Sequence, residues 1–128
     1  MNKVKLKDRY IFPAIFQHCD GSYTVTFPDL PGCITEGSDI DEALKMAKEA
    51  MELHIYNMED DKEKIPTPSK PESIKLPKHS FTSLIEVWMP PVRNEMRIYQ
   101  KDADHSKVVK RYSFRKKAQL FSITSNRG

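Results

Sequence analysis

Two short runs of aromatic and β-branched residues, joined by an Asp-Gly turn, constrain the fold of this chain more than any other feature. The first run spans residues 10–17, and the second, in which apolar and hydroxyl residues alternate, spans residues 23–27. Asp20 and Gly21 lie between the runs, and this arrangement is a strong short-range signal for a β-hairpin. Pro13 cannot donate a backbone hydrogen bond, so we expect an edge position or a bulge in the first strand.

The following residues predict a third strand and one long helix. Residues 28–32 are a proline- and glycine-rich loop, and residues 33–37 are long enough for a strand. Ser38 or Asp39 is suited to cap the helix that follows. Apolar residues then recur at intervals of three and four, which indicates one apolar helix face. They are Ile40, Ala43, Leu44, Ala47, Met51, Ile55 and Met58.

A proline-rich connection leads to the last strand. Residues 62–80 contain four of the nine prolines and predict an extended linker. Residues 81–89 predict a strand that ends at Pro90. The chain is therefore expected to be α+β, with a small antiparallel sheet of three strands, one long helix and a final strand. One helix covers only one face of such a sheet, so we expect a homo-oligomer, a dimer or a tetramer.

The charge changes sign along the 128 residues, whose formal net charge is +3. Residues 10–61 carry two basic and eleven acidic side chains, a net charge of −9, whereas residues 92–128 carry ten basic and three acidic side chains. No sustained apolar period follows residue 91. We therefore divide the chain into an acidic domain, residues 1–91, and a basic tail, residues 92–128. The domain would attract a basic protein, and the tail could attract nucleic acid.

Cysteine usage and hydropathy indicate a cytoplasmic protein. No apolar run approaches the ~20 residues of a membrane-spanning helix, and the basic first residues lack the apolar stretch of a secretory signal. Cys19 and Cys33 are expected to be reduced thiols. Neither CxxC nor HxxxH spacing occurs, so we predict no metal, no cofactor and no membrane partner.

The sequence FPDLPGC, closely followed by EGSDIDEA, resembles the HicB family. The resemblance extends over about residues 8–91, from the hairpin to the final strand. HicB proteins are the antitoxins of bacterial, phage and archaeal toxin–antitoxin pairs. The resemblance implies a truncated RNase H-like fold that binds HicA, a small basic toxin that cleaves mRNA. It also implies self-association and a C-terminal DNA-binding element that represses the operon.

An RNase H-like fold raises the question of catalysis. Hydrolysis with two metal ions needs several carboxylates that converge from neighbouring strands. The first predicted strand contains no acid; Asp8 precedes it, Asp29 lies in a loop, and Glu86 is alone on the last strand. We therefore predict that the protein is not an enzyme.

These observations favour an antitoxin that covers the RNA-cleaving site of a HicA-type toxin. Two alternatives stay open, a non-catalytic RNase H-like protein that binds nucleic acid and an oligomeric scaffold without a toxin. The tail has no amphipathic frame for a helix that reads bases, so DNA binding is expected to be non-specific. The predicted toxin-binding residues are Asp29, Leu30, Glu36, Asp41, Glu42 and Glu49. The predicted nucleic-acid-binding residues are Lys107, Lys110, Arg111, Arg115, Lys116 and Lys117.

Overall fold

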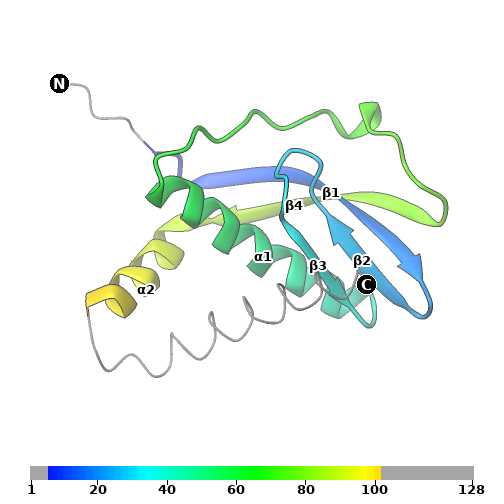
Figure 1. Cartoon of the computed structure of the whole chain (residues 1–128), viewed down its shortest axis with the longest axis horizontal. Helices are drawn as coiled ribbons and strands as arrows, with labels where there is room; N and C mark the ends of the chain where they lie inside the picture. The colour runs from blue at the N-terminus through cyan, green and yellow to red at the C-terminus, as the bar shows by residue number, and fades with distance from the viewer. Residues whose placement is uncertain (1–5, 102–128) are drawn as a thin grey trace.

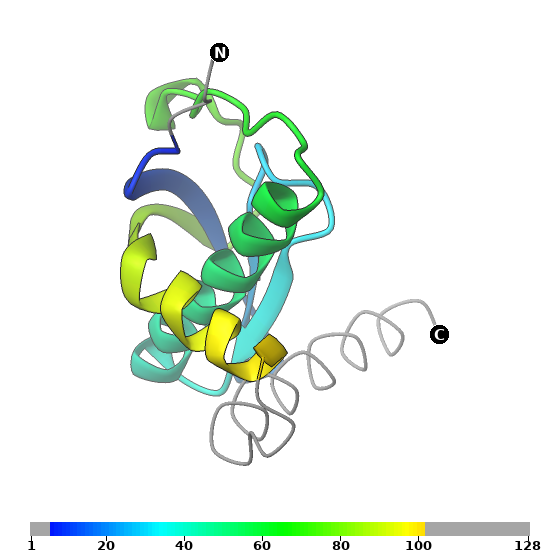
Figure 2. The same ribbon diagram turned by 90° about the vertical axis from the view of Figure 1, so that its left-hand side faces the viewer.

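The computed structural model describes residues 6–101, which form a four-stranded antiparallel sheet with helices on one face (Figure 1). The strands follow the order β3-β2-β1-β4 across the sheet. Helix α1 packs on the sheet, and α2 lies beside α1 (Figure 2). The elements are β1 (Arg9–Cys19), β2 (Ser22–Thr26), β3 (Ile34–Gly37), α1 (Ile40–Asp60), η1, a 3₁₀ turn (Pro71–Ser73), β4 (Ser80–Trp88) and α2 (Met89–Lys101).

The predicted α+β fold and hairpin are confirmed. Cys19 pairs with Ser22, so only Asp20 and Gly21 form the turn between β1 and β2. Both turn residues have positive φ, +50° and +80°, as a type I′ hairpin requires. The Asp-Gly sequence therefore sets the register of the two strands.

Pro13 lies where β1 is locally an edge of the sheet, as predicted. The amide of His18 donates to the carbonyl of His79, 2.9 Å away, so the even-numbered residues of β1 form hydrogen bonds toward β4. Odd-numbered residues face the opposite side, because backbone groups alternate along a strand. On that side the pairing with β2 begins only at Ile15. The missing amide hydrogen of Pro13 therefore costs the sheet no ladder hydrogen bond.

Helix α1 begins with the predicted cap and packs very closely on the sheet. The Asp39 carboxylate accepts the Glu42 backbone amide at 2.8 Å, and the Glu42 side chain accepts the Ser38 amide at 2.6 Å. This arrangement resembles a capping box, except that Glu42 accepts the amide of the residue before the cap instead of the amide of Asp39 itself. Three alanines of α1 let the helix approach Phe12, Phe16 and other inward-facing side chains of the strands. The buried residues of α1 are Ala43, Ala47, Ala50, Met51, Leu53 and Ile55.

Helix α2 corrects the expected end of the last strand, because β4 ends at Trp88 and a helix, not a tail, follows it. It starts at Met89 and buries Val92 and Met96 in the same core as α1 and the sheet. Pro90 and Pro91 occupy the first turn, where their missing amide hydrogens would have no partner within the helix anyway. The expected domain boundary at residue 91 thus falls inside an element that packs on the acidic domain.

We predict that Gly37→Ala destabilises the protein by about 1–3 kcal/mol, the range for overpacking a rigid contact. A Cβ atom at Gly37 would lie 2.4 Å from the backbone nitrogen of Ala43, so α1 would have to move away from β3. Denaturant unfolding measures the loss. The neighbouring Glu36→Ala variant is the control, because an exposed side chain should change stability by only about 0.5 kcal/mol. Equal stability of the two variants would contradict the close packing of α1.

Candidate functional site

The carboxylates considered for catalysis lie apart, and each has a structural partner. Asp8 binds Arg93 at 2.8 Å, and Glu86 binds Arg9 at 2.7 Å on the sheet. The Asp29 carboxylate accepts the backbone amide of Ser69 at 2.9 Å. In the described part of the chain, no three His, Cys, Asp or Glu side chains are arranged to hold a metal ion.

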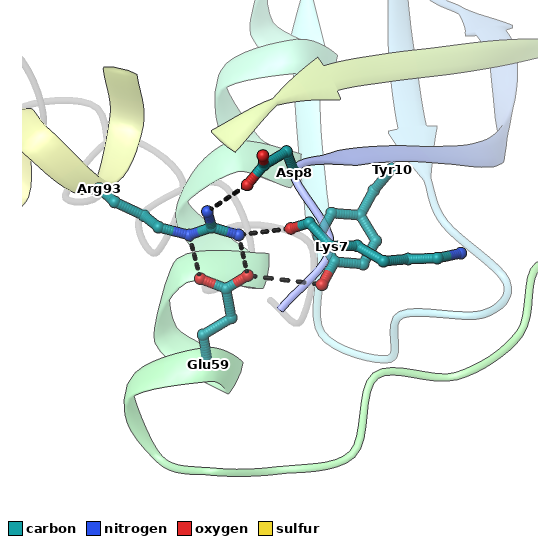
Figure 3. Close-up of polar contacts among 5 residues, drawn as sticks. All are labelled: Lys7, Asp8, Tyr10, Glu59 and Arg93. Atoms are coloured by element: carbon teal, nitrogen blue, oxygen red, sulfur yellow. Dashed lines mark hydrogen bonds and ion pairs between the residues drawn. The ribbon is translucent and has the colours of Figure 1, made fainter. Parts of the chain in front are cut away.

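Arg93 of α2 is the centre of a polar cluster that joins three elements (Figure 3). Its guanidinium donates to both carboxylate oxygens of Glu59 in α1, at 2.9 Å each. It also donates to the Asp8 carboxylate and to the carbonyl of Lys7, just before β1. The Tyr10 hydroxyl donates to Glu59 at 3.4 Å. The cluster therefore fixes the first turn of α2 against the end of α1 and the start of β1.

The electrostatics of this cluster follow from the burial of Glu59, whose side chain is only 5% exposed. The hydrogen bonds to Glu59 raise the pKa of Arg93 above its ordinary value and outweigh the opposing effect of burial. Burial also raises the pKa of Tyr10, and the nearby Glu59 charge raises it further. Because an isolated buried carboxylate is costly, the bidentate pair with Arg93 is what allows Glu59 to lie here.

The predicted toxin-binding residues do not form one cluster. Asp41 and Glu42 are exposed in the first turn of α1, and Glu49 is half-buried further along that helix. Glu36 is exposed on β3, on the sheet face opposite α1, because Thr35 and Gly37 beside it face the helix and are buried. Three acids of the predicted set are therefore exposed. Asp41 and Glu42 lie together on α1, and Glu36 lies on another face of the molecule.

Asp29 and Leu30 have structural roles. Leu30 is 1% exposed and belongs to the core, so its side chain is not presented at the surface. Asp29 is half-buried and also accepts the Ser69 hydroxyl, which ties the β2–β3 loop to the proline-rich linker. Their places in FPDLPGC are thus explained by folding. The predicted nucleic-acid-binding residues, from Lys107 to Lys117, lie outside the described residues.

Sequence reasoning missed an apolar ridge on the outer face of the sheet. Leu84 and Trp88 of β4 are 57% and 54% exposed, while Ile85 and Val87 between them face the helices and are buried. Leu84 is paired with Pro13 across the sheet, and Ile15 lies half-buried on the same face. We call Ile15, Leu84 and Trp88 the outer ridge. The sequence signal for this ridge is that residues 84–88 carry apolar side chains on both faces of the strand, instead of on the buried face alone.

The two thiols differ in chemistry. Cys33 is fully buried after the β2–β3 loop, and burial raises its pKa to about 12. Because the thiolate is the reactive form, Cys33 is not suited to be a nucleophile. Cys19 is exposed at the end of β1. Neither helix among residues 6–101 has the length and apolar content to cross a membrane.

Comparison with known proteins gives a consistent result. The profile of a family described as the HicB-like antitoxin of bacterial toxin–antitoxin systems matches residues 12–97. Antitoxin HicB 2 of Photorhabdus laumondii is 38% identical over 58 residues, which are 45% of this chain and 42% of that protein. The chain thus spans less than half the length of the first curated relatives that it matches.

Two solved structures have a similar fold. The N-terminal domain of Burkholderia pseudomallei antitoxin HicB has a TM-score of 0.52 and 29% identity, over 61% of this chain and 98% of that one. A chain of a HicA3 and HicB3 toxin–antitoxin complex has a TM-score of 0.51 and 23% identity. This match covers 59% of this chain and 95% of that one, and at such low identity it bears on the fold alone.

We predict that Arg93→Ala lowers the free energy of unfolding by about 2–3 kcal/mol, because it leaves the buried Glu59 carboxylate without its charged partner. Arg97→Ala is the control, since Arg97 is exposed and donates to Asn94 on its own helix. Denaturant unfolding compares the two variants. Adding Glu59→Gln to Arg93→Ala should recover part of the loss. No recovery would contradict the role assigned to the pair.

We also predict that only one of the two cysteines of the native protein reacts with a thiol reagent. Cys19 should be labelled rapidly, whereas Cys33 should react only after denaturation because it is buried and protonated. Mass spectrometry of the labelled protein identifies the modified residue. Cys19→Ser should abolish native labelling, and rapid labelling of that variant would contradict the burial of Cys33.

Proposed function

Because the chain belongs to the HicB-like antitoxin family, we propose that it neutralises a HicA-type toxin by covering the RNA-cleaving site of that toxin. The observation that carries this proposal is the family match over residues 12–97. That match includes β2, β3, α1 and β4 completely and most of β1 and α2. The mechanism is stoichiometric binding, without a chemical step in this chain. Such a protein would act in the cytoplasm, where its toxin meets mRNA.

The charge of the domain supports a basic partner. Residues 10–61 have a net charge of −9, and the acids Asp41, Glu42, Asp60 and Asp61 are exposed on or beside α1. Opposite charge on two proteins accelerates their encounter and selects among partners. We place the toxin contact on the acids of α1, with Asp41 at its centre. Asp29 and Leu30 would contribute to toxin binding indirectly, because they shape the β2–β3 loop.

Self-association is the second part of the proposal, and we place it on the outer ridge. A second copy of this chain is a suitable occupant because the ridge is apolar and nearly neutral. Its nearest charges, Arg9 and Glu86, neutralise each other at 2.7 Å. Two such surfaces would meet without charge repulsion and would bury Leu84 and Trp88. The result would be a dimer, or a tetramer if a second interface is added.

DNA binding is the third part. The basic residues of the tail, from Lys107 to Lys117, would contact phosphates, and binding would be non-specific and sensitive to salt. Family resemblance favours autorepression of the operon. The proposal therefore keeps toxin binding on the folded domain and assigns contact with nucleic acid to the tail.

Residues 1–101 should be sufficient to neutralise the toxin, because α2 completes the core and the acids assigned to the toxin contact all precede α2. Cells that express the cognate HicA-type toxin should grow when this fragment is co-expressed, and the two proteins should co-purify. Asp41→Lys should weaken toxin binding about tenfold or more. Glu72→Lys, an exposed acid on η1, is the charge-matched control. Neutralisation only by the full chain would show that the tail carries the contact.

Replacing the outer ridge should produce a monomer. Leu84→Glu combined with Trp88→Glu places charge on the apolar surface, and sedimentation at micromolar concentration should then show one chain per particle. Leu76→Glu is the control, because Leu76 is an exposed apolar residue of the linker. The unchanged protein should sediment as a dimer or larger species. A monomeric unchanged protein would overturn this part of the proposal.

A further inference from the structure

The first half of β1 has an open side that presents backbone hydrogen-bonding groups. β2 pairs with β1 only from Ile15 onward, so no strand among residues 6–101 lies beside Arg9 and Ile11 on that side. Their amide and carbonyl groups point there, because the even-numbered residues of β1 bond to β4. Within residues 6–101 no loop backbone forms a hydrogen bond to these groups.

A groove of about 1170 Å³ runs along this open side. One wall is the start of β1, and the other is the linker at residues 62–68, which passes alongside β1 in Figure 1. Leu6, Ile65 and Pro66 give the groove an apolar lining. Its volume exceeds the ~300–1,000 Å³ that is typical of small-molecule sites. We call this feature the β1 edge groove.

Backbone groups on one wall and apolar side chains on the other suit an extended peptide. A peptide strand added to a sheet edge obtains main-chain hydrogen bonds from the edge, and its alternate side chains fit neighbouring pockets. Pro13 limits this pairing, since it offers a carbonyl but no amide hydrogen. The groove therefore offers the backbone amides of Arg9 and Ile11 as hydrogen-bond donors. It ends near Ile15, where β2 begins to pair with β1.

The charge of the groove selects the kind of peptide. Lys7, Lys62 and Lys64 line it without an ion pair in the described residues, and Glu63 is the only acid not held by an arginine. The other two charges of the lining are neutralised, Arg9 by Glu86 and Glu59 by Arg93. The excess of positive charge favours an acidic segment. It disfavours the basic tail, a second copy of the same edge and the basic toxin of the proposed function.

We propose that the β1 edge groove binds an extended acidic segment of another protein as an added β-strand beside residues 9–13. The added strand takes hydrogen bonds from the backbone of Arg9 and Ile11, and the three lysines hold its acidic side chains. The groove lies at the C-terminal end of α1, whereas Asp41, the centre of the contact assigned to the toxin, lies in the first turn of that helix. The chain would thereby contact two partners at once.

The test uses a synthetic eight-residue peptide that alternates valine and glutamate, with blocked ends, added to the ¹⁵N-labelled full chain. The amide signals of Arg9 and Ile11 should shift in a saturable way. A matched peptide with lysine in place of glutamate should bind at least ~10-fold more weakly at low salt, and the difference should shrink as salt screens the charges. Absence of shifts at Arg9 and Ile11 at millimolar peptide, or equal binding of both peptides, would overturn the proposal.

Variants separate this site from the rest of the fold. Ile11→Pro removes an amide hydrogen that faces the groove and should reduce peptide binding at least ~10-fold, whereas Ile11→Val keeps the amide and should bind as before. Lys62→Glu combined with Lys64→Glu should reduce binding similarly through charge alone, which decides the matter if the proline variant does not fold. All three variants that fold should still co-purify with the toxin. Loss of the toxin instead of the peptide would assign the groove to the toxin and refute the proposal.

Discussion

The close contact between α1 and β3 determines where the other elements lie. Gly37 has no side chain, and Ala43 and Ala47 have small ones, so the helix backbone lies directly on the sheet. This places the far end of α1 beside the start of β1, where Glu59 meets Arg93. The position of α2 therefore depends on a contact at the opposite end of α1.

Features that depend on neighbouring residues could be predicted from the sequence. The Asp-Gly turn, the cap at Asp39 and the apolar face of α1 are each encoded within a few residues, and the structure contains all three. The local edge at Pro13 was also predictable, because proline lacks a donor. Helix α2 was not, since its two prolines resemble a strand end and its buried face is marked by just Met89, Val92 and Met96 among the described side chains.

The acidic character of the candidate toxin-binding surface could be predicted from the sequence, but the positions and partners of its acids could not. The acids of residues 10–61 are visible in the sequence, yet their partners lie far away in the chain. Asp29 holds Ser69, which is 40 residues distant, and Glu59 holds Arg93, which is 34 residues distant. A helical or strand period contains no information on such pairs. For the same reason, the sequence alone could not distinguish a buried Leu30, which the structure shows, from a Leu30 that contacts a partner at the surface.

Pro13 has a consequence for colloidal stability. An exposed strand edge with free amides is a template on which identical chains can stack into fibrils, and such growth needs a ladder that continues along the strand. In β1 the ladder is interrupted at Pro13 after the donors of Arg9 and Ile11, and beyond it β2 occupies the edge. The lysines around the edge repel further copies of the same chain. Both features oppose polymerisation of the protein through the open side of β1.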